Sequence, residues 1–272
     1  MTSSTDLLLE TTAHASLLEF LEDTEQVVKQ VGLLLLSQFG QVLSQQKADG
    51  SLVTQADRDA DTALVSALRQ RYPHHSLLTE EGCQTFDGAE WCWVIDPLDG
   101  TTNFAQGVPI WGISVALLHQ GRPLFGLGHF PPVQQTFWAA VGEGAFLNGN
   151  RLRTRTQDIG ANDFFNLCSR TLNRYEVALP CKPRILGSAA HNLMAVANSS
   201  VRGGIEATPK AWDLAAAWVI VPEAGGVVRT LSGVDPFPLE PGQDYTNRSF
   251  AVLAAGTEEI WQQLRACLRE AD

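Results

Sequence analysis

The chain has 272 residues, 44% of them hydrophobic, which is enough to bury a core in one large domain or two closely joined ones. Its net charge of −11 and its pI near 5.0 argue against nucleic acid as a general partner, because phosphate backbones are bound by basic surfaces. A small phosphorylated ligand stays open, since a metal ion can supply positive charge locally.

Cysteine usage and the N-terminal segment indicate the compartment. The five cysteines are scattered without a Cys-x-x-Cys pair, as expected in a reducing compartment. The first 26 residues contain acids and lack the basic start of a signal peptide, and the apolar run 33–36 is far too short to span a membrane. We therefore expect a cytoplasmic protein with no membrane partner.

Two helices are predicted in the first 72 residues. Apolar side chains recur at helical spacing over about residues 14–39, and Gly40 closes that segment. A polar loop with a short strand-like centre follows. The second helix begins near Asp57 and ends before Pro73, with one apolar face (Ala60, Leu64, Leu68 and Tyr72).

The next segments are mostly of β type. Residues 76–82 predict a short strand that ends in acids, and residues 90–96 predict a stronger one. Residues 111–130 and 134–154 each predict a hairpin with glycine in its turns.

From about residue 184 helical and extended patterns alternate. Helices are predicted at 188–199, 212–225 and 257–270, and extended segments at 201–208, 226–230 and 250–256. We expect an N-terminal α+β half over 1–155 and a C-terminal α/β half over 156–272, joined in one compact unit because no long linker separates them.

Acidic residues mark the ends of the predicted elements. Glu80 and Glu81, and then Asp96 and Asp99, stand at strand ends, and Asp213 stands at a helix start. Layered α/β folds place their sites at such positions. Carboxylates gathered there would form a hard-oxygen site suited to Mg²⁺ or Mn²⁺, and a cation would relieve their mutual repulsion.

The residues after Asp99 favour an anion beside that cation. Gly100 lets the backbone approach a ligand closely, and Thr101 and Thr102 stand at a predicted helix start, where free N–H groups would point at a phosphate. Phosphoryl transfer to water needs this combination, because metals neutralise phosphate oxygens and activate water while N–H groups hold transition-state charge.

Each acid also has a simpler interpretation when taken alone. The Glu80-Glu81 pair fits a solvated loop, Asp99 fits a turn cap, and Asp213 fits a helix-start acid stabilised by the helix dipole. Other known motifs do not match: Leu98 interrupts an EF-hand pattern, and no Walker A lysine pattern, G-x-S-x-G elbow or metal-binding histidine spacing is present. The combination of acids favours the metal interpretation.

These residues resemble a known family. "WVIDPLDGTTNFAQGVPIWGISVAL" (93–117) and "WDLAAAWVIVPEAGG" (212–226) are similar to the two signature motifs of the inositol monophosphatases, which belong to the magnesium-dependent, lithium-sensitive phosphatase superfamily. Four further blocks match in the same order, over about residues 20–265. The resemblance implies an α+β fold, a layered α-β-α-β-α sandwich, and a homodimer.

The resemblance also implies the metal ligands. By position, Glu80 and Asp96 would bind a first Mg²⁺ together with the backbone carbonyl of Leu98. Asp96, Asp99 and Asp213 would bind a second, and Glu80 would reach a third and weaker one. Two to three Mg²⁺ ions per site are therefore expected, with Mn²⁺ as an alternative.

Further roles come from the same resemblance. Thr101 and Asp57 would polarise the attacking water, with Glu81 as a supporting acid nearby, while Gly100 and Thr101 would hold phosphate through backbone N–H groups. Glu206 would contact inositol hydroxyls, and Ala190 would form part of the substrate wall.

The implied reaction is hydrolysis of inositol monophosphate to inositol and phosphate by a metal-activated water, and Asn103-Phe104 resembles the inositol-type branch. The alternatives are another small phosphoester (a 3′,5′-bisphosphonucleotide, histidinol phosphate or fructose bisphosphate) or a catalytically weak regulatory relative. The chain departs from the family at segment 156–183, which is short, and at His191, where a leucine-type residue is usual. Lys47, in the N-terminal loop, is a further match.

Overall fold

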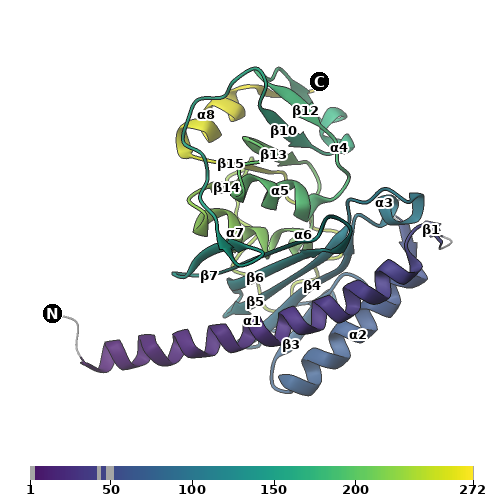
Figure 1. The fold of residues 1–272 in the computed structure, drawn as a ribbon, viewed down its shortest axis with the longest axis vertical. Helices are drawn as coiled ribbons and strands as arrows, with labels where there is room; N and C mark the ends of the chain where they lie inside the picture. Colours follow the sequence, from purple (N-terminus) through teal and green to yellow (C-terminus); the bar gives the residue numbers. More distant parts are fainter. Residues whose placement is uncertain (1–3, 42–43, 47–51, 272) are drawn as a thin grey trace.

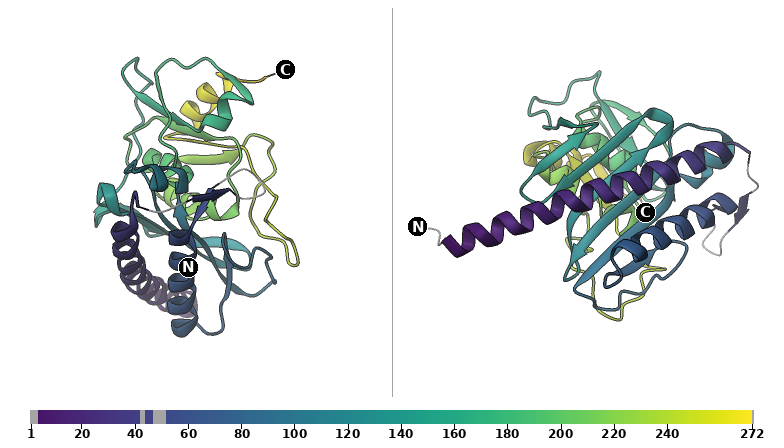
Figure 2. Two further views of the ribbon diagram at one scale, coloured as in Figure 1. Left: turned by 90° about the vertical axis from the view of Figure 1, so that its right-hand side faces the viewer. Right: turned by 60° about the horizontal axis from the view of Figure 1, so that its bottom comes forward.

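The computed structural model describes residues 4–41, 44–46 and 52–271. Across these residues helices and sheets alternate in layers, which confirms the predicted α+β sandwich with its α-β-α-β-α order (Figure 1). The outer helices α1 (Ser4–Gln38) and α2 (Gln55–Arg71) lie side by side on one face of the larger sheet (Figure 2). A middle layer of helices separates the two sheets, and α8 (Glu258–Ala266) packs against the smaller one.

Within the described residues, the larger sheet has seven strands in sequence order. The pair β3–β4 is parallel and the other pairs are antiparallel. The strands are β3 (Ser76–Thr79), β4 (Trp91–Asp99), β5 (Gly112–His119), β6 (Arg122–Phe130), β7 (Gln135–Ala140), β8 (Gly144–Leu147) and β9 (Asn150–Arg151).

The smaller sheet has five described strands in the order β12-β10-β13-β15-β14. They are β12 (Lys182–Arg184), β10 (Phe164–Leu167), β13 (Gly203–Glu206), β15 (Val252–Ala255) and β14 (Val227–Thr230). The middle layer holds α5 (Ala189–Ala197), α6 (Ala211–Leu214) and α7 (Ala217–Glu223). Short elements complete the chain: β1 (Ser44–Gln46), β2 (Leu52–Thr54), α3 (Thr101–Gln106), η1 (Pro131–Val133), α4 (Ser169–Leu172), β11 (Tyr175–Val177) and β16 (Leu268–Glu270).

The apolar residues of β4 alternate between two cores. Trp93 and Ile95 pack with the buried faces of α1 and α2, whereas Cys92 and Val94 pack with the middle helices. This alternation follows from the two-residue period of a strand. It also decides which layer an acid at the end of β4 can face.

Three predicted helices have different bounds in the structure. The first begins at Ser4 rather than near residue 14, because no proline or glycine interrupts the helix-forming residues before it. The helix predicted at 212–225 is divided into α6 and α7, and at the start of α7 the Val219 N–H bonds the Ala216 carbonyl only three residues back. The last helix ends at Ala266, after which β16 pairs with β11.

Sequence patterns did not predict β10, β11 and β12, which have three or four residues each. Such segments are too short to show a period, and their pairing with distant strands decides their conformation. Among the described residues, no helix combines the length and hydrophobicity needed to cross a membrane.

Candidate metal centre and active site

A bulge at the end of β4 places two acids on the same side of the sheet. Asp96 pairs with Ser114 of β5, and Asp99 pairs with Gly112, so three steps along β4 match two steps along β5. On a regular strand residues three apart face opposite sides, and one extra residue corrects this. Both acids therefore face the middle helices.

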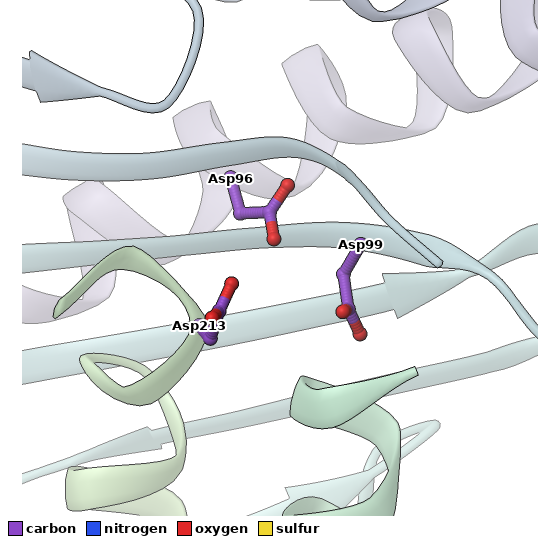
Figure 3. A group of neighbouring side chains, drawn as sticks. All are labelled: Asp96, Asp99 and Asp213. Carbon is purple, nitrogen blue, oxygen red and sulfur yellow. The ribbon is translucent and has the colours of Figure 1, made fainter. Parts of the chain in front are cut away.

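Asp213 reaches the same place from the first turn of α6. The Lys210 N–H donates to Asp213 Oδ2 at 2.7 Å and fixes the carboxylate beside the helix start. Asp96, Asp99 and Asp213 each offer a carboxylate oxygen within 4.8 Å of the others, and Figure 3 shows the three side chains gathered between β4 and the helices. The positions of these acids at a strand end and a helix start favoured a shared site, and the family resemblance implied that the three act together.

Without a cation, burial and mutual repulsion disfavour the charged forms of the three carboxyl groups. Burial raises the pKa of Asp96 well above its usual range, and Glu80, Asp99 and Asp213 add to the effect by charge repulsion. Burial also raises the pKa of Asp99 to about 6 and, with Glu80 and Asp99 nearby, that of Asp213 to about 8. Because hard oxygen donors suit Mg²⁺ and a divalent charge offsets this repulsion, the residues present fit the expected metal.

The start of α5 holds Asp99 in place. The Ser188 hydroxyl donates to Asp99 Oδ2, and the N–H groups of Ala189 and Ala190 donate to the same carboxylate at 3.0 and 2.9 Å. Ser188 is also the N-cap of α5, where its oxygen accepts the His191 N–H at 3.3 Å. Sequence reasoning did not identify Ser188, although a serine just before an apolar helical segment is an N-cap signal.

Thr101 and Asp57 form a hydrogen-bonded pair beside the acids. The Thr101 hydroxyl lies 2.8 Å from Asp57 Oδ1 and 3.1 Å from the Leu98 carbonyl oxygen. The backbone N–H and the hydroxyl of Thr54 donate to Asp57 Oδ2 at 2.7 and 2.6 Å, which closes the capping box of α2. Asp57 is buried and is not among the residues that line the cleft, whereas Thr101, to which it is hydrogen-bonded, is.

The backbone around Gly100 requires glycine. Its φ is +90°, in the left-handed region, and a Cβ there would lie 2.9 Å from the Ile110 carbonyl oxygen. The Asn103 amide donates to the carbonyls of Ile110 and Leu186 at 2.6 and 2.7 Å. Asn103, which the sequence identified only as a mark of the inositol-type branch, thus joins the turn after β4 to the segment before α5.

Glu80 and Glu81 follow β3 in a braced turn. The Gly82 N–H donates to the Thr79 hydroxyl oxygen at 2.8 Å, and that hydroxyl in turn bonds the Asp61 carboxylate. Glu80 lines the same cleft as the three aspartates but is not part of the 4.8 Å group. Glu81 lies on the Asp57 side, where its charge helps to raise the pKa of Asp57 after burial, the main cause.

The acids open into a cleft of about 330 Å³. Its wall includes the first turn of α3 and, from the C-terminal half, Glu206 at the end of β13. Asn192 donates to Glu206 Oε1 at 2.6 Å, and burial raises the pKa of Glu206 to about 7. Ala190 is fully buried and does not line the cleft; Ser188 and Ala189 do.

Two other expected residues remain. The Leu98 carbonyl oxygen lies 3.1 Å from the Thr101 hydroxyl oxygen, and the Leu98 N–H donates to Asp96 Oδ1 at 3.0 Å. Leu98 lines the cleft, and its role as a metal ligand stays a prediction. Lys47 lies outside the described residues.

Comparison with known proteins agrees with this geometry. The Inositol monophosphatase family matches residues 16–271. The chain is 34% identical over 216 residues to the "Fructose-1,6-bisphosphatase/inositol-1-monophosphatase" of Thermotoga maritima, and the matched region covers 76% of this chain and 83% of that protein. It is also 34% identical over 238 residues to the "Nus factor SuhB" of Pasteurella multocida, covering 82% and 86%. The solved structure of a Thermotoga maritima IMPase superposes with a TM-score of 0.77 at 28% identity, covering 92% of this chain and 98% of that one. The chain therefore belongs to the inositol monophosphatase family.

Proposed function

We propose that this protein is a Mg²⁺-dependent phosphomonoesterase that hydrolyses inositol monophosphate to inositol and phosphate. The observation that carries the proposal is the meeting of Asp96, Asp99 and Asp213 within 4.8 Å at a cleft whose wall also includes the first turn of α3. Family membership supports phosphatase activity, while one relative is named for two substrates and another is named as a Nus factor.

In this proposal the acids would hold two to three Mg²⁺ ions. Asp96, Asp99 and Asp213 would share one, and Glu80, Asp96 and the Leu98 carbonyl would hold another. When bound, such ions neutralise phosphate oxygens and make water a better nucleophile near neutral pH. Mn²⁺ has similar ligand preferences and would substitute.

The protein groups would orient the reactants. With the Thr101 hydroxyl donating to Asp57, the lone pairs of its oxygen are left to accept a hydrogen bond from the attacking water. The backbone N–H groups of Gly100 and Thr101 would hold phosphate oxygens at the start of α3, with Glu81 as a nearby supporting acid. The water oxygen joins phosphorus and gives up a proton, the P–O ester bond breaks, and the leaving alkoxide oxygen takes up a proton to become the alcohol.

Glu206 would accept hydrogen bonds from the hydroxyls of the alcohol. Its position in the cleft wall, held by Asn192, supports this role. Ala190 would act indirectly, through the N–H that it donates to Asp99.

The experiment is a panel of phosphomonoesters compared by kcat/KM, with Mg²⁺ present or removed by a chelator. We expect Mg²⁺-dependent release of phosphate, highest with inositol 1-phosphate. A higher kcat/KM with a 3′,5′-bisphosphonucleotide, histidinol phosphate or fructose bisphosphate would replace the substrate. Mg²⁺ binding without turnover of any phosphomonoester would refute the enzyme proposal and favour a regulatory relative.

We also propose a homodimer. Support comes from α1, whose N-terminal turns extend beyond the sheet (Figure 1) and whose described part exposes Leu33 by 68% as well as parts of Leu34 and Leu36. Light scattering coupled to size exclusion should give twice the chain mass of 29.6 kDa. A mass of one chain at micromolar concentration would contradict this.

A further inference from the structure

The side chains that line the cleft are charged unevenly. Carboxylates dominate: Glu80, Asp96, Asp99, Asp213 and Glu206. Among the described lining residues a single cationic side chain, Arg170, stands on the wall formed by the C-terminal half. Part of the role of Arg170 is electrostatic, because its charge lowers the pKa of Glu206 on the same wall against the larger effect of burial.

The backbone that carries Arg170 is firmly held. Arg170 lies in the short helix α4, where Thr171 is fully buried, its N–H bonds the Cys168 carbonyl at 3.0 Å and its hydroxyl bonds the Ile205 carbonyl at 3.4 Å. The Arg170 side chain is exposed, and its Nη1 donates to the Thr208 hydroxyl at 3.1 Å. Thr208 lines the same cleft, so this bond keeps the guanidinium at the wall.

The described contacts leave most of the guanidinium available. Arginine has five N–H donors, and one hydroxyl oxygen occupies one of them. Within the described part of the chain no ion pair of 4.0 Å or less joins Arg170 to a carboxylate. Its charge acts on Glu206 from a longer distance, while Asn192 donates the hydrogen bond to that carboxylate. A planar fork of donors matches the oxygens of a carboxylate or phosphate.

We propose that Arg170 is a specificity-determining residue that binds a second anionic group, phosphate or carboxylate, on the alcohol part of the phosphomonoester. The inference rests on the proposed function and extends its substrate class to phosphomonoesters whose alcohol part carries a second anionic group. The ester phosphate lies at the aspartates, Glu206 contacts hydroxyls, and Arg170 holds the second oxyanion at the far wall. When the alcohol part of the ester is uncharged, Arg170 stays hydrated and does not contribute to substrate binding.

The test compares matched substrates. Glycerol 2-phosphate and 2-phosphoglycerate share a skeleton, but only the second carries a carboxylate. Fructose 1-phosphate and fructose 1,6-bisphosphate differ by one phosphate. We expect the wild type with Mg²⁺ to favour the doubly anionic member of at least one pair by about tenfold or more in kcat/KM, and the pair concerned tells whether carboxylate or phosphate is preferred.

Arg170→Gln should lower kcat/KM for that doubly anionic substrate by about ten- to hundredfold, mainly by raising KM. For the other member of the pair, whose alcohol part is uncharged, kcat/KM should stay within about threefold of the wild-type value. Arg174→Gln is the matched control, because Arg174 is also exposed, bonds the Ala207 carbonyl at 3.3 Å and does not line the cleft. Arg174→Gln should leave kcat/KM unchanged for both members of each pair.

Two results would overturn the inference. If glycerol 2-phosphate and fructose 1-phosphate are hydrolysed and Arg170→Gln changes kcat/KM equally for both members of each pair, this inference is refuted while the proposed function stands. Absence of turnover with every compound would refute the proposed function and this inference together.

Discussion

Ser188 gives the sharpest prediction about the metal centre. Ser188→Ala removes the hydroxyl that donates to Asp99 and accepts the His191 N–H at 3.3 Å. A lost helix cap costs about 1 kcal/mol, and a lost hydrogen bond to a charged group costs about 1.5–3 kcal/mol. We expect the free energy of unfolding to fall by about 2–4 kcal/mol, which a domain with roughly 5–15 kcal/mol of stability survives.

The same change should weaken Mg²⁺ binding in a pH-dependent way. Burial raises the pKa of Asp99 to about 6, and the Ser188 hydroxyl is the strongest of the groups that oppose this rise. Loss of about 1.5–3 kcal/mol from the charged form raises the proton affinity of Asp99 by roughly ten- to hundredfold. The Mg²⁺ concentration for half saturation should therefore rise about two- to tenfold at pH 7, and the difference should nearly vanish at pH 9.

The assay is calorimetric titration of Mg²⁺ at pH 7 and pH 9, with thermal unfolding in parallel. Ser188→Thr keeps a hydroxyl and should restore most of the binding. Thr257→Ala is the control, because Thr257 caps α8 by accepting the Ile260 N–H at 3.2 Å and lies outside the cleft. If Ser188→Ala destabilises the protein as Thr257→Ala does but leaves Mg²⁺ binding unchanged at pH 7, the reasoning is refuted.

Three further predictions concern the turn after β3, the middle layer and the metal-free state. Thr79→Val removes the acceptor of the Gly82 N–H bond at 2.8 Å, so kcat should fall roughly tenfold in steady-state assays, and Thr79→Ser should restore it. Burial lowers the pKa of His191 to about 4, so the unfolded state binds the proton more tightly and stability is lost as pH falls from 6.5 toward 4. His191→Leu should reduce this loss in urea unfolding at pH 5 compared with pH 7.5. In the metal-free protein the pKa values of Asp99 and Asp213 are raised to about 6 and about 8, so stability present at low pH is lost as pH rises through that range. The rise in Tm on adding Mg²⁺ should therefore be larger at pH 8 than at pH 5.5.

Each of these has an outcome that contradicts it. An unchanged kcat in Thr79→Val would show that the brace behind Glu80 has no catalytic effect. If the wild type and His191→Leu lose equal stability between pH 7.5 and pH 5, residues other than His191 cause the loss of stability in acid. A Mg²⁺-induced rise in Tm that is equal at both pH values would mean that the aspartates are already charged in the metal-free protein.

Local patterns predicted much of the fold because its larger elements have clear periods. The apolar face of α2, the alternating strand β4 and the two hairpins are each long enough to show 3.6- or 2-residue repeats. The same patterns placed Asp96 and Asp99 at a strand end and Asp213 at a helix start, from which a shared cation site could be expected.

Other features depend on distant partners and left no local signal. The bulge that turns Asp96 and Asp99 to one side exists only in the pairing of β4 with β5. The bond from Ser188 to Asp99 joins residues 89 positions apart. Arg170 reaches the cleft because α4 is fastened to β13, which no local period at residues 168–172 reveals. Long-range geometry therefore decided how the predicted acids are held and what else lines their cleft.

The central claim is that the aspartate centre makes this chain a Mg²⁺-dependent phosphatase, and Asp99→Asn tests it most directly. The substitution keeps the size of the side chain and removes the charge held by the start of α5. Release of phosphate from inositol 1-phosphate should rise with Mg²⁺ concentration in the wild type and be lost in Asp99→Asn at every Mg²⁺ concentration. Equal release by both proteins, or release by the wild type that is insensitive to Mg²⁺ removal, would contradict the account.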